Sequence, residues 1–196
     1  KNKIILLNNG YFRKIKKENN KKFNPNQIKL GYFGLISDSS NSYRDVKVIY
    51  KSLPNRNKLN FTFYGNSIIK NTKIKNYKKF NFKKNVPYFN ALLKMQEFDY
   101  LLILHTEKST SKEVVTGKFY EYLSSGVPIV LISNGETEVG KLVKKYNLGH
   151  AIDYSKQSLS KFFVELSENK MKFKTIKDIK RFSREEQNKK RLKIIN

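Results

Sequence analysis

A lysine and two glutamates near the middle of the chain have the types and spacing of a site for an anionic, hydroxyl-bearing ligand. Lys118 and Glu121 share one short amphipathic stretch, and Glu113 stands eight positions before Glu121. A carboxylate can accept hydrogen bonds from both hydroxyls of one ribose. Gly117 stands where the stretch begins, so the amides of a helix start can face phosphate groups there, and Lys118 adds positive charge. This chemistry suits a nucleotide diphosphate sugar.

The same residues also have a simpler interpretation. They could form an amphipathic helix whose charges are solvated, followed by a turn at Gly126, Val127 and Pro128 and by a core strand. Short motifs match by chance often enough that spacing alone leaves both interpretations open. The elements that would position the residues therefore have to decide between them.

Apolar runs of strand length alternate with stretches of helical spacing along most of the chain. The predicted strands are residues 4–7, 28–35, 59–64, 73–80, 100–104, 128–132 and 151–152. The predicted helices are residues 43–53, 85–97, 118–125, 136–146, 159–166 and 175–192. This alternation predicts an α/β fold with a doubly wound, Rossmann-like parallel sheet.

Such a sheet brings the loops that follow its strands together at one edge. Ligands bind beyond the carboxyl ends of the strands in this class of fold. Glu113, Lys118 and Glu136 all follow predicted strands and would lie along that edge. This convergence favours the nucleotide site over the solvated helix.

Positive charge dominates the composition but is not gathered at the candidate site. The chain has 41 Lys and Arg against 16 Asp and Glu, a formal net charge of +25. Residues 66–84 hold seven Lys and no acid, and the chain from Lys170 onward is again basic, whereas acids gather between positions 101 and 160. The basic segments would attract a polyanion such as nucleic acid or an anionic membrane face. An AT-rich coding bias is the competing explanation.

The sequence lacks the motifs of several classes of protein. With no Cys and two His, the chain has no metal-ligand cluster of the usual spacing, and neither a metal nor a cofactor is expected. Neither a P-loop nor the Gly-x-Ser-x-Gly motif of a hydrolase occurs. No apolar run approaches the roughly 20 residues of a membrane span. His105 follows a predicted strand, but without an identifiable partner a structural role is its favoured interpretation.

These motifs together resemble the C-terminal, donor-binding half of a GT-B fold glycosyltransferase of the family 4 type. Residues 118–128 resemble the family's Lys-x-x-Glu-Tyr-Leu-x-x-Gly-x-Pro motif. Glu113 and Glu121 match its two glutamates separated by seven residues. A predicted strand ending at Gly34, followed by Arg44, resembles the strand and basic residue that open the donor domain.

The resemblance implies a role for each matching residue around the nucleotide. Glu121 would hold the ribose hydroxyls of the donor. Lys118 and Arg44 would neutralise its diphosphate, and Gly117 would let backbone amides approach it. The base would pack near Val86 and Tyr88.

The remaining implied roles concern the sugar and the chemistry. Gly34 would allow close approach of the donor, and Glu113 would face the sugar or its leaving phosphate. The implied catalytic residues are Glu113, Lys118 and Arg44. The implied reaction is that of a retaining glycosyltransferase, which moves a sugar from a UDP- or GDP-sugar to a saccharide or lipid-linked acceptor in surface polysaccharide synthesis, without a metal ion.

The resemblance also implies a division of the chain. Residues 1–27 would be a linker or arm from a missing N-terminal acceptor domain, residues 28–170 the nucleotide-sugar-binding domain, and residues 171–196 a basic C-terminal helix. The chain alone would then bind donor without transferring sugar. The whole enzyme would work in the cytoplasm, drawn to the inner membrane face by its basic segments.

One alternative from another class remains at this stage. The chain could be a non-catalytic basic module that binds RNA or an anionic surface, although nucleic acid is the less favoured partner. Loss of the Glu121 carboxylate separates the two hypotheses, because it should weaken binding of a nucleotide sugar but not of a polyanion.

Overall fold

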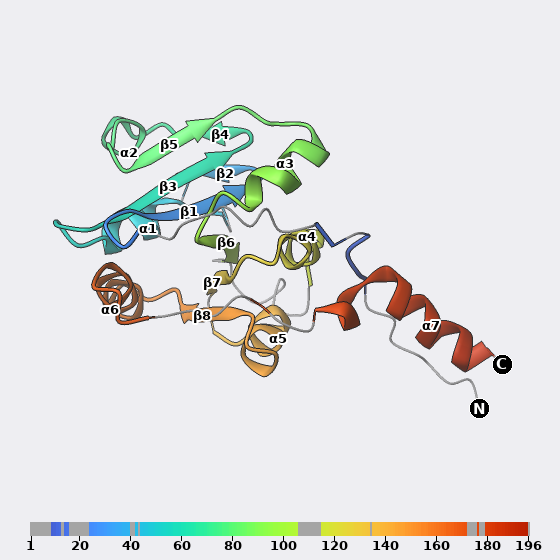
Figure 1. Cartoon of the computed structure of the whole chain (residues 1–196). Coiled ribbons are helices and arrows are strands. Elements are labelled where there is room, and N and C mark those ends of the chain that lie inside the picture. Colours follow the sequence, from blue (N-terminus) through green and yellow to red (C-terminus); the bar gives the residue numbers. More distant parts are fainter. Residues whose placement is uncertain are drawn as a thin grey trace.

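The computed structural model describes residues 9–12, 14–15, 24–39, 42, 44–105, 115–133, 135–171, 176 and 179–195. The predicted strand 4–7 and Glu113 lie outside these residues. Figure 1 shows a central sheet with helices on both of its faces.

Six parallel strands form the sheet, in the order β5-β3-β1-β6-β7-β8. The strands are β1 (Ile28–Phe33), β3 (Leu59–Tyr64), β5 (Phe80–Lys83), β6 (Tyr100–His105), β7 (Ile129–Ser133) and β8 (Gly149–Asp153). The chain builds outward from β1 to one edge, returns to the middle and builds from β6 to the other edge. This is the doubly wound order, with its switch point between β1 and β6. The predicted fold class is confirmed.

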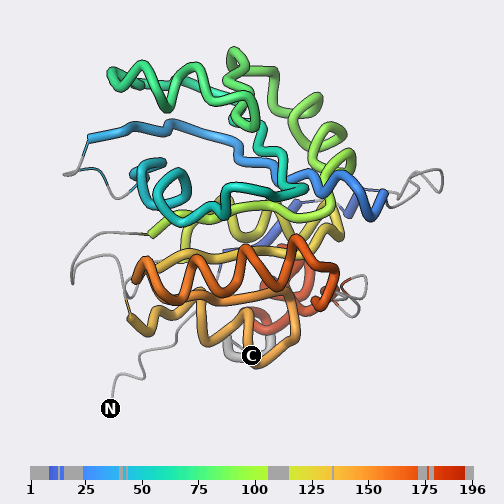
Figure 2. Tube along the Cα trace, turned by 90° about the vertical axis from the view of Figure 1, so that its left-hand side faces the viewer, coloured from blue at the N-terminus to red at the C-terminus, as the bar shows by residue number. Residues whose placement is uncertain are grey.

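Helices cover both faces of the sheet and close two separate cores (Figures 1 and 2). One core lies beneath α1 and α6, and the other beneath α3, α4 and α5. The helices are α1 (Lys47–Ser52), α2 (Thr72–Lys75), α3 (Tyr88–Met95), α4 (Gly117–Ser125), α5 (Glu138–Lys145), α6 (Lys156–Ser167), the 3-10 helix η1 (Lys180–Phe182) and α7 (Arg184–Ile195). A separate pair of short parallel strands joins β2 (Ile36–Ser37) to β4 (Ser67–Ile68).

The predicted strand at 73–80 is wrong. Residues Thr72–Lys75 form the short helix α2, because the side chain of Asn71 accepts the amide hydrogen of Ile74 at 3.2 Å and caps the turn. The strand β5 begins only at Phe80, where Phe80 pairs with Phe61 of β3. The Lys-rich stretch offers few apolar side chains to bury, so the sheet edge starts where the aromatic residues do.

The predicted helix at 175–192 is interrupted at Ser183. This residue is extended, with φ −76° and ψ 150°, and its hydroxyl accepts the amide hydrogen of Glu186 at 3.2 Å. Ser183 therefore acts as the N-cap that separates η1 from α7. The backbone of Tyr11 lies beside this break, since its amide donates to the Phe182 carbonyl at 2.9 Å and its carbonyl accepts from the Arg184 amide at 2.9 Å.

Helix α4 is fixed to β1 by one buried hydrogen bond. The hydroxyl oxygen of Tyr122 accepts the amide hydrogen of Phe33 at 3.0 Å. The Tyr122 side chain is fully buried, and burial raises the pKa of its hydroxyl well above the ordinary value. Because an unpaired buried amide is costly, this contact sets where α4 begins relative to the end of β1.

Replacing Tyr122 with Phe should therefore destabilise the chain. The substitution keeps the ring but leaves the buried amide of Phe33 without its acceptor, at a cost of about 1–3 kcal/mol in the free energy of unfolding. Urea denaturation measures the loss, and Tyr88→Phe is the control because the Tyr88 ring is half exposed. Equal stability of Tyr122→Phe and wild type would show that the bond does not hold α4 in place.

Candidate functional site

The candidate site lies at the switch point, where β1 and β6 are neighbours and their following segments diverge. Strand β1 ends at Phe33 and is followed by Gly34, while β6 ends at His105. Helix α4 starts at Gly117, on the face of the sheet that carries the second core. Ligand sites in doubly wound folds lie at this point.

The ammonium of Lys118 lies directly against the end of β1. Its Nζ atom is 3.9 Å from the centre of the Tyr32 ring, a cation–π contact. A Cβ atom at Gly34 would lie only 2.9 Å from the same Nζ. Gly34 also has φ +137°, a conformation that L side chains rarely adopt. The backbone conformation therefore favours glycine here, and a side chain would also have to displace the end of Lys118.

A second glycine supports the first. The amide of Gly34 donates to the Tyr64 carbonyl at 2.7 Å, and Gly65 follows directly. A Cβ at Gly65 would lie 2.4 Å from the carbonyl oxygen of Gly34, so the two backbones touch. Sequence reasoning singled out Gly34 but missed Gly65, whose only signal was its place directly after a predicted strand.

Two cations and one carboxylate interact across this region. Burial and then the charge of Arg44 lower the pKa of Lys118 to about 7, while Glu121 opposes the change. Burial raises the pKa of Glu121, and Lys118 opposes that change in turn. Because Lys118 faces a second cation in a partly dehydrated setting, an anion would be stabilised here.

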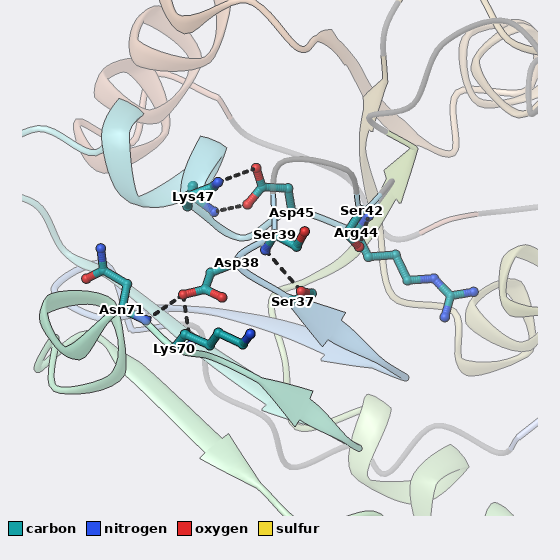
Figure 3. Close-up of polar contacts among 9 residues, drawn as sticks. All are labelled: Ser37, Asp38, Ser39, Ser42, Arg44, Asp45, Lys47, Lys70 and Asn71. Carbon is teal, nitrogen blue, oxygen red and sulfur yellow. Dashed lines mark hydrogen bonds and ion pairs between the residues drawn. The ribbon is translucent and has the colours of Figure 1, made fainter.

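The loop that carries Arg44 is held by its own backbone and carboxylates (Figure 3). The Ser37 amide donates to the Arg44 carbonyl at 3.2 Å, and the buried carboxylate of Asp45 accepts the Lys47 amide hydrogen at 2.8 Å. Figure 3 shows the Arg44 side chain extending away from Asp45 and Lys47. Its charge is thus directed out of the cluster that shapes the loop.

The loop is also fixed to the segment before α2. The carboxylate of Asp38 accepts the amide hydrogens of Lys70 at 3.0 Å and Asn71 at 2.6 Å. Burial opposes the change, but these two amides lower the pKa of Asp38 below its ordinary value. Asp38 therefore stabilises the loop. Arg44 is the charged side chain of this loop that we expect to contact a ligand.

The start of α4 has no side-chain cap. Thr116 is its N-cap residue, and no side-chain hydrogen bond closes the first turn. Gly117 is exposed, and a Cβ there would meet nothing within 4 Å. The first amides of a helix lack partners within the helix and can bind an anion. The glycine thus leaves open space in front of those amides.

The residues expected near the base lie beside α4. Tyr88 begins α3, and burial together with the carboxylate of Glu121 raises the pKa of Tyr88, while Arg184 lowers it. Tyr88 and Glu121 are therefore within electrostatic reach of each other. Val86 is half-buried in the segment that leads into α3. Glu113 lies outside the described residues, so its place relative to Lys118 is not given.

A separate cavity of about 220 Å³ lies at the ends of β7 and β8. It is lined by Glu136, Thr137 and Asp153, among others. Glu136 therefore lies at this cavity, at the ends of β7 and β8. Within the described ranges no three His, Asp or Glu side chains gather as a metal site would require. No helix in the described part of the chain is long and apolar enough to cross a membrane.

Solved structures resemble this arrangement although their sequences differ. The Anabaena protein Alr3699/HepE in complex with UDP and glucose aligns with 87% of the chain at a TM-score of 0.59 and 16% identity. The lipopolysaccharide outer core galactosyltransferase WaaB aligns with 97% of it at a TM-score of 0.62 and 12% identity. The chain has the fold of one half of a GT-B glycosyltransferase. It spans about half of each structure, 48% of HepE and 55% of WaaB.

A structure with a different enzymatic activity also contains this fold in part of its length. The UDP-GlcNAc 2-epimerase of Methanocaldococcus jannaschii aligns with 87% of the chain at a TM-score of 0.51 and 16% identity, over 46% of its own length. No protein-family model and no curated protein sequence matches the chain. At these identities the likeness establishes the fold, and the reaction has to be argued from residues.

The lowered pKa of Lys118 predicts a pH-dependent stability. Below pH 7 both the folded and the unfolded chain carry the Lys118 proton, so the full cost of burying the charge is present. Between that pKa and the ordinary value of 10.5, the folded chain has already released the proton, so its free energy of unfolding rises with pH.

Lys118→Met should therefore raise the free energy of unfolding by about 1–3 kcal/mol at pH 6, and this gain should shrink as the pH rises above 7. Urea denaturation across this pH range measures it. Lys83→Met, at an exposed position of β5, controls for the loss of one positive charge from the chain. The same pH dependence in both variants would contradict the burial of Lys118.

Proposed function

We propose that this chain is the donor-binding half of a retaining glycosyltransferase of the family 4 type and that it binds a nucleotide diphosphate sugar. The observation that carries the proposal is the position of Lys118, whose ammonium is held over Gly34 at the switch point beside Arg44. Two cations and an uncapped helix start converge there. A diphosphate adds negative charge to a setting in which two cations face one carboxylate, that of Glu121.

The proposed chemistry is electrostatic. The diphosphate lies between Lys118, Arg44 and the first amides of α4. As the bond to the sugar breaks, negative charge grows on the leaving phosphate, and these groups stabilise it. Binding also raises the pKa of Lys118, because the ammonium gains an anionic partner. The donor is therefore bound best when Lys118 is protonated.

The nucleoside is held one turn along α4. Glu121 follows Lys118 by three positions and so shares its face of the helix. Its partly buried carboxylate accepts hydrogen bonds from the two ribose hydroxyls. These bonds replace the hydrogen bonds to water that the carboxylate loses on burial. Tyr88, on the neighbouring α3, lies on the side where the base would pack. We propose a UDP-sugar as donor, in keeping with the ligands of HepE, and a GDP-sugar as the alternative.

Transfer requires a second domain. The chain spans about half of the GT-B structures that it resembles, and the acceptor would bind mainly to the other half. A saccharide or lipid-linked acceptor in surface polysaccharide synthesis is proposed, since WaaB acts on the lipopolysaccharide outer core. Transfer is favoured over epimerisation by the motif at residues 118–128 and its match to the transferase pattern.

Glu121→Gln tests the site by isothermal titration with UDP. Loss of a charged acceptor costs about 1.5–3 kcal/mol, so affinity should fall by roughly 10- to 100-fold. Glu138→Gln, on the exposed start of α5, is the matched control and should bind UDP as wild type does. Heparin binding should be unchanged in both variants. Equal UDP affinity in wild type and Glu121→Gln would refute the assignment.

The basic segments lie at opposite ends of the molecule. In Figure 1 helix α2 lies at the upper left and α7 at the far right. A flat membrane would therefore meet one segment or the other. Lys189 of α7 is paired with Glu185 at 2.7 Å and Glu186 at 3.2 Å, whereas residues 66–84 contain no acid. We propose that the segment 66–84 is the membrane-facing one.

Replacing Lys70, Lys73 and Lys75 together with Gln should weaken binding to phosphatidylserine vesicles by about 3 kcal/mol at low salt, or roughly 100-fold. All three side chains are exposed. The control replaces Lys189, Lys190 and Arg191 of α7 and should have a smaller effect. Co-sedimentation measures binding. If wild type does not bind at low salt, coding bias is the better explanation of the positive charge.

A further inference from the structure

The histidine at the end of β6 is buried without a complete set of hydrogen bonds. His105 is 4% exposed, and its Nδ1 atom has no hydrogen-bond partner within the described part of the chain. A buried polar atom without a partner costs about 1–3 kcal/mol. The described residues offer no compensation for this atom, which suits a role outside packing.

The side chain of His105 points toward α4. Leu102 and Leu104 of β6 belong to the core beneath α1 and α6, whereas Leu101 and Ile103 belong to the core beneath α3 to α5. Side chains alternate between the two faces of a strand, so His105 follows Leu101 and Ile103. It therefore faces the helix whose first turn carries Lys118.

Electrostatics places the ring close to both site cations. Burial lowers the pKa of His105, and Lys118 and then Arg44 lower it further. The imidazole is thus neutral at neutral pH and adds a hydrogen-bonding group rather than a third charge. The Oγ1 atom of Thr116, at the N-cap of α4, is a second buried polar atom without a partner in the described residues.

A single ligand group satisfies all of these residues. An anion is favoured beside the neighbouring cations Lys118 and Arg44, and the imidazole Nδ1 requires a hydrogen-bond acceptor in its N–H form. A sugar hydroxyl could meet the second need but not the first. A phosphate oxygen meets both, because it is anionic and accepts several hydrogen bonds.

We propose that His105 is a further donor-binding residue, whose Nδ1–H donates a hydrogen bond to a phosphate oxygen of the nucleotide diphosphate beside Lys118 and Arg44. This rests on the proposed function, since it names a residue of the same site. The contact assigns a use to the unpartnered atom and adds a group to the diphosphate site that no motif of the sequence indicates.

Two variants of His105 test the contact on the full chain. His105→Asn places an amide N–H close to the position of Nδ1 and cannot titrate near neutral pH, whereas His105→Leu has no donor. Isothermal titration with UDP should show about a tenfold loss for His105→Leu. His105→Asn should stay within about threefold of wild type. Ligand-observed NMR with uridine, which lacks phosphate, should show equal binding by all three proteins.

Proton uptake supplies a readout that a purely structural role would not change. A bound phosphate raises the pKa of His105 and Lys118, so UDP binding near pH 7 should take up protons. Titrations in two buffers of different ionisation enthalpy measure the number, which should be lower in His105→Asn than in wild type. Thermal unfolding checks that both variants are folded.

Unchanged UDP affinity in His105→Leu would overturn the proposal, as would an equal loss of UDP and uridine binding. Pyrophosphate separates failure of this proposal from failure of the proposed function. If wild type binds pyrophosphate but not UDP, and His105→Leu binds pyrophosphate more weakly, the anion contact stands and the nucleotide function fails. If wild type binds neither pyrophosphate nor UDP, both fail.

Discussion

The enclosed ammonium of Lys118 is the contact on which the rest of the site depends. A buried cation is costly, and here it is held by the face of the Tyr32 ring, 3.9 Å away, with Arg44 acting against it. The two neighbouring cations therefore favour binding of an anion. The uncapped start of α4 at Gly117 leaves open space through which an anion can approach.

Three features keep that arrangement in place. The hydroxyl of Tyr122 binds the Phe33 amide and fixes α4 against the end of β1. Gly34 leaves the space that the lysine occupies, and Gly65 leaves the space that the Gly34 carbonyl occupies. A side chain at Gly65 would meet the backbone of Gly34, whereas one at Gly34 would displace the end of Lys118. The switch point is thus shaped by contacts between residues far apart in the chain.

The sequence was sufficient for the fold class and for most elements that surround the site. The strand and helix around residues 118–132 were predicted because their local pattern is strong. The strand at 73–80 was wrong because one side-chain cap at Asn71 outweighs a weak apolar pattern. The break at Ser183 was missed because a capping serine inside a basic stretch looks like part of one helix.

The limits for the site have a different cause. Gly34, Lys118 and Glu121 were predicted as site residues from their motifs, and the structure places the Lys118 ammonium 2.9 Å from where a Cβ at Gly34 would lie. His105 was interpreted as structural because the sequence offered no partner for it. Its two cationic neighbours lie far along the chain, Lys118 on α4 and Arg44 on the loop before α1. No sequence spacing relates His105 to these two cations, so their proximity can be seen only in the folded structure.

The most direct test of this account is an NMR titration of the Lys118 side chain, assigned by comparison with Lys118→Met. The account predicts a midpoint near 7 in the free chain. It also predicts a clear rise when UDP is bound, because the diphosphate then stabilises the ammonium. A midpoint near the ordinary value of 10.5, unchanged by UDP, would contradict both the burial of the charge and its proposed partner.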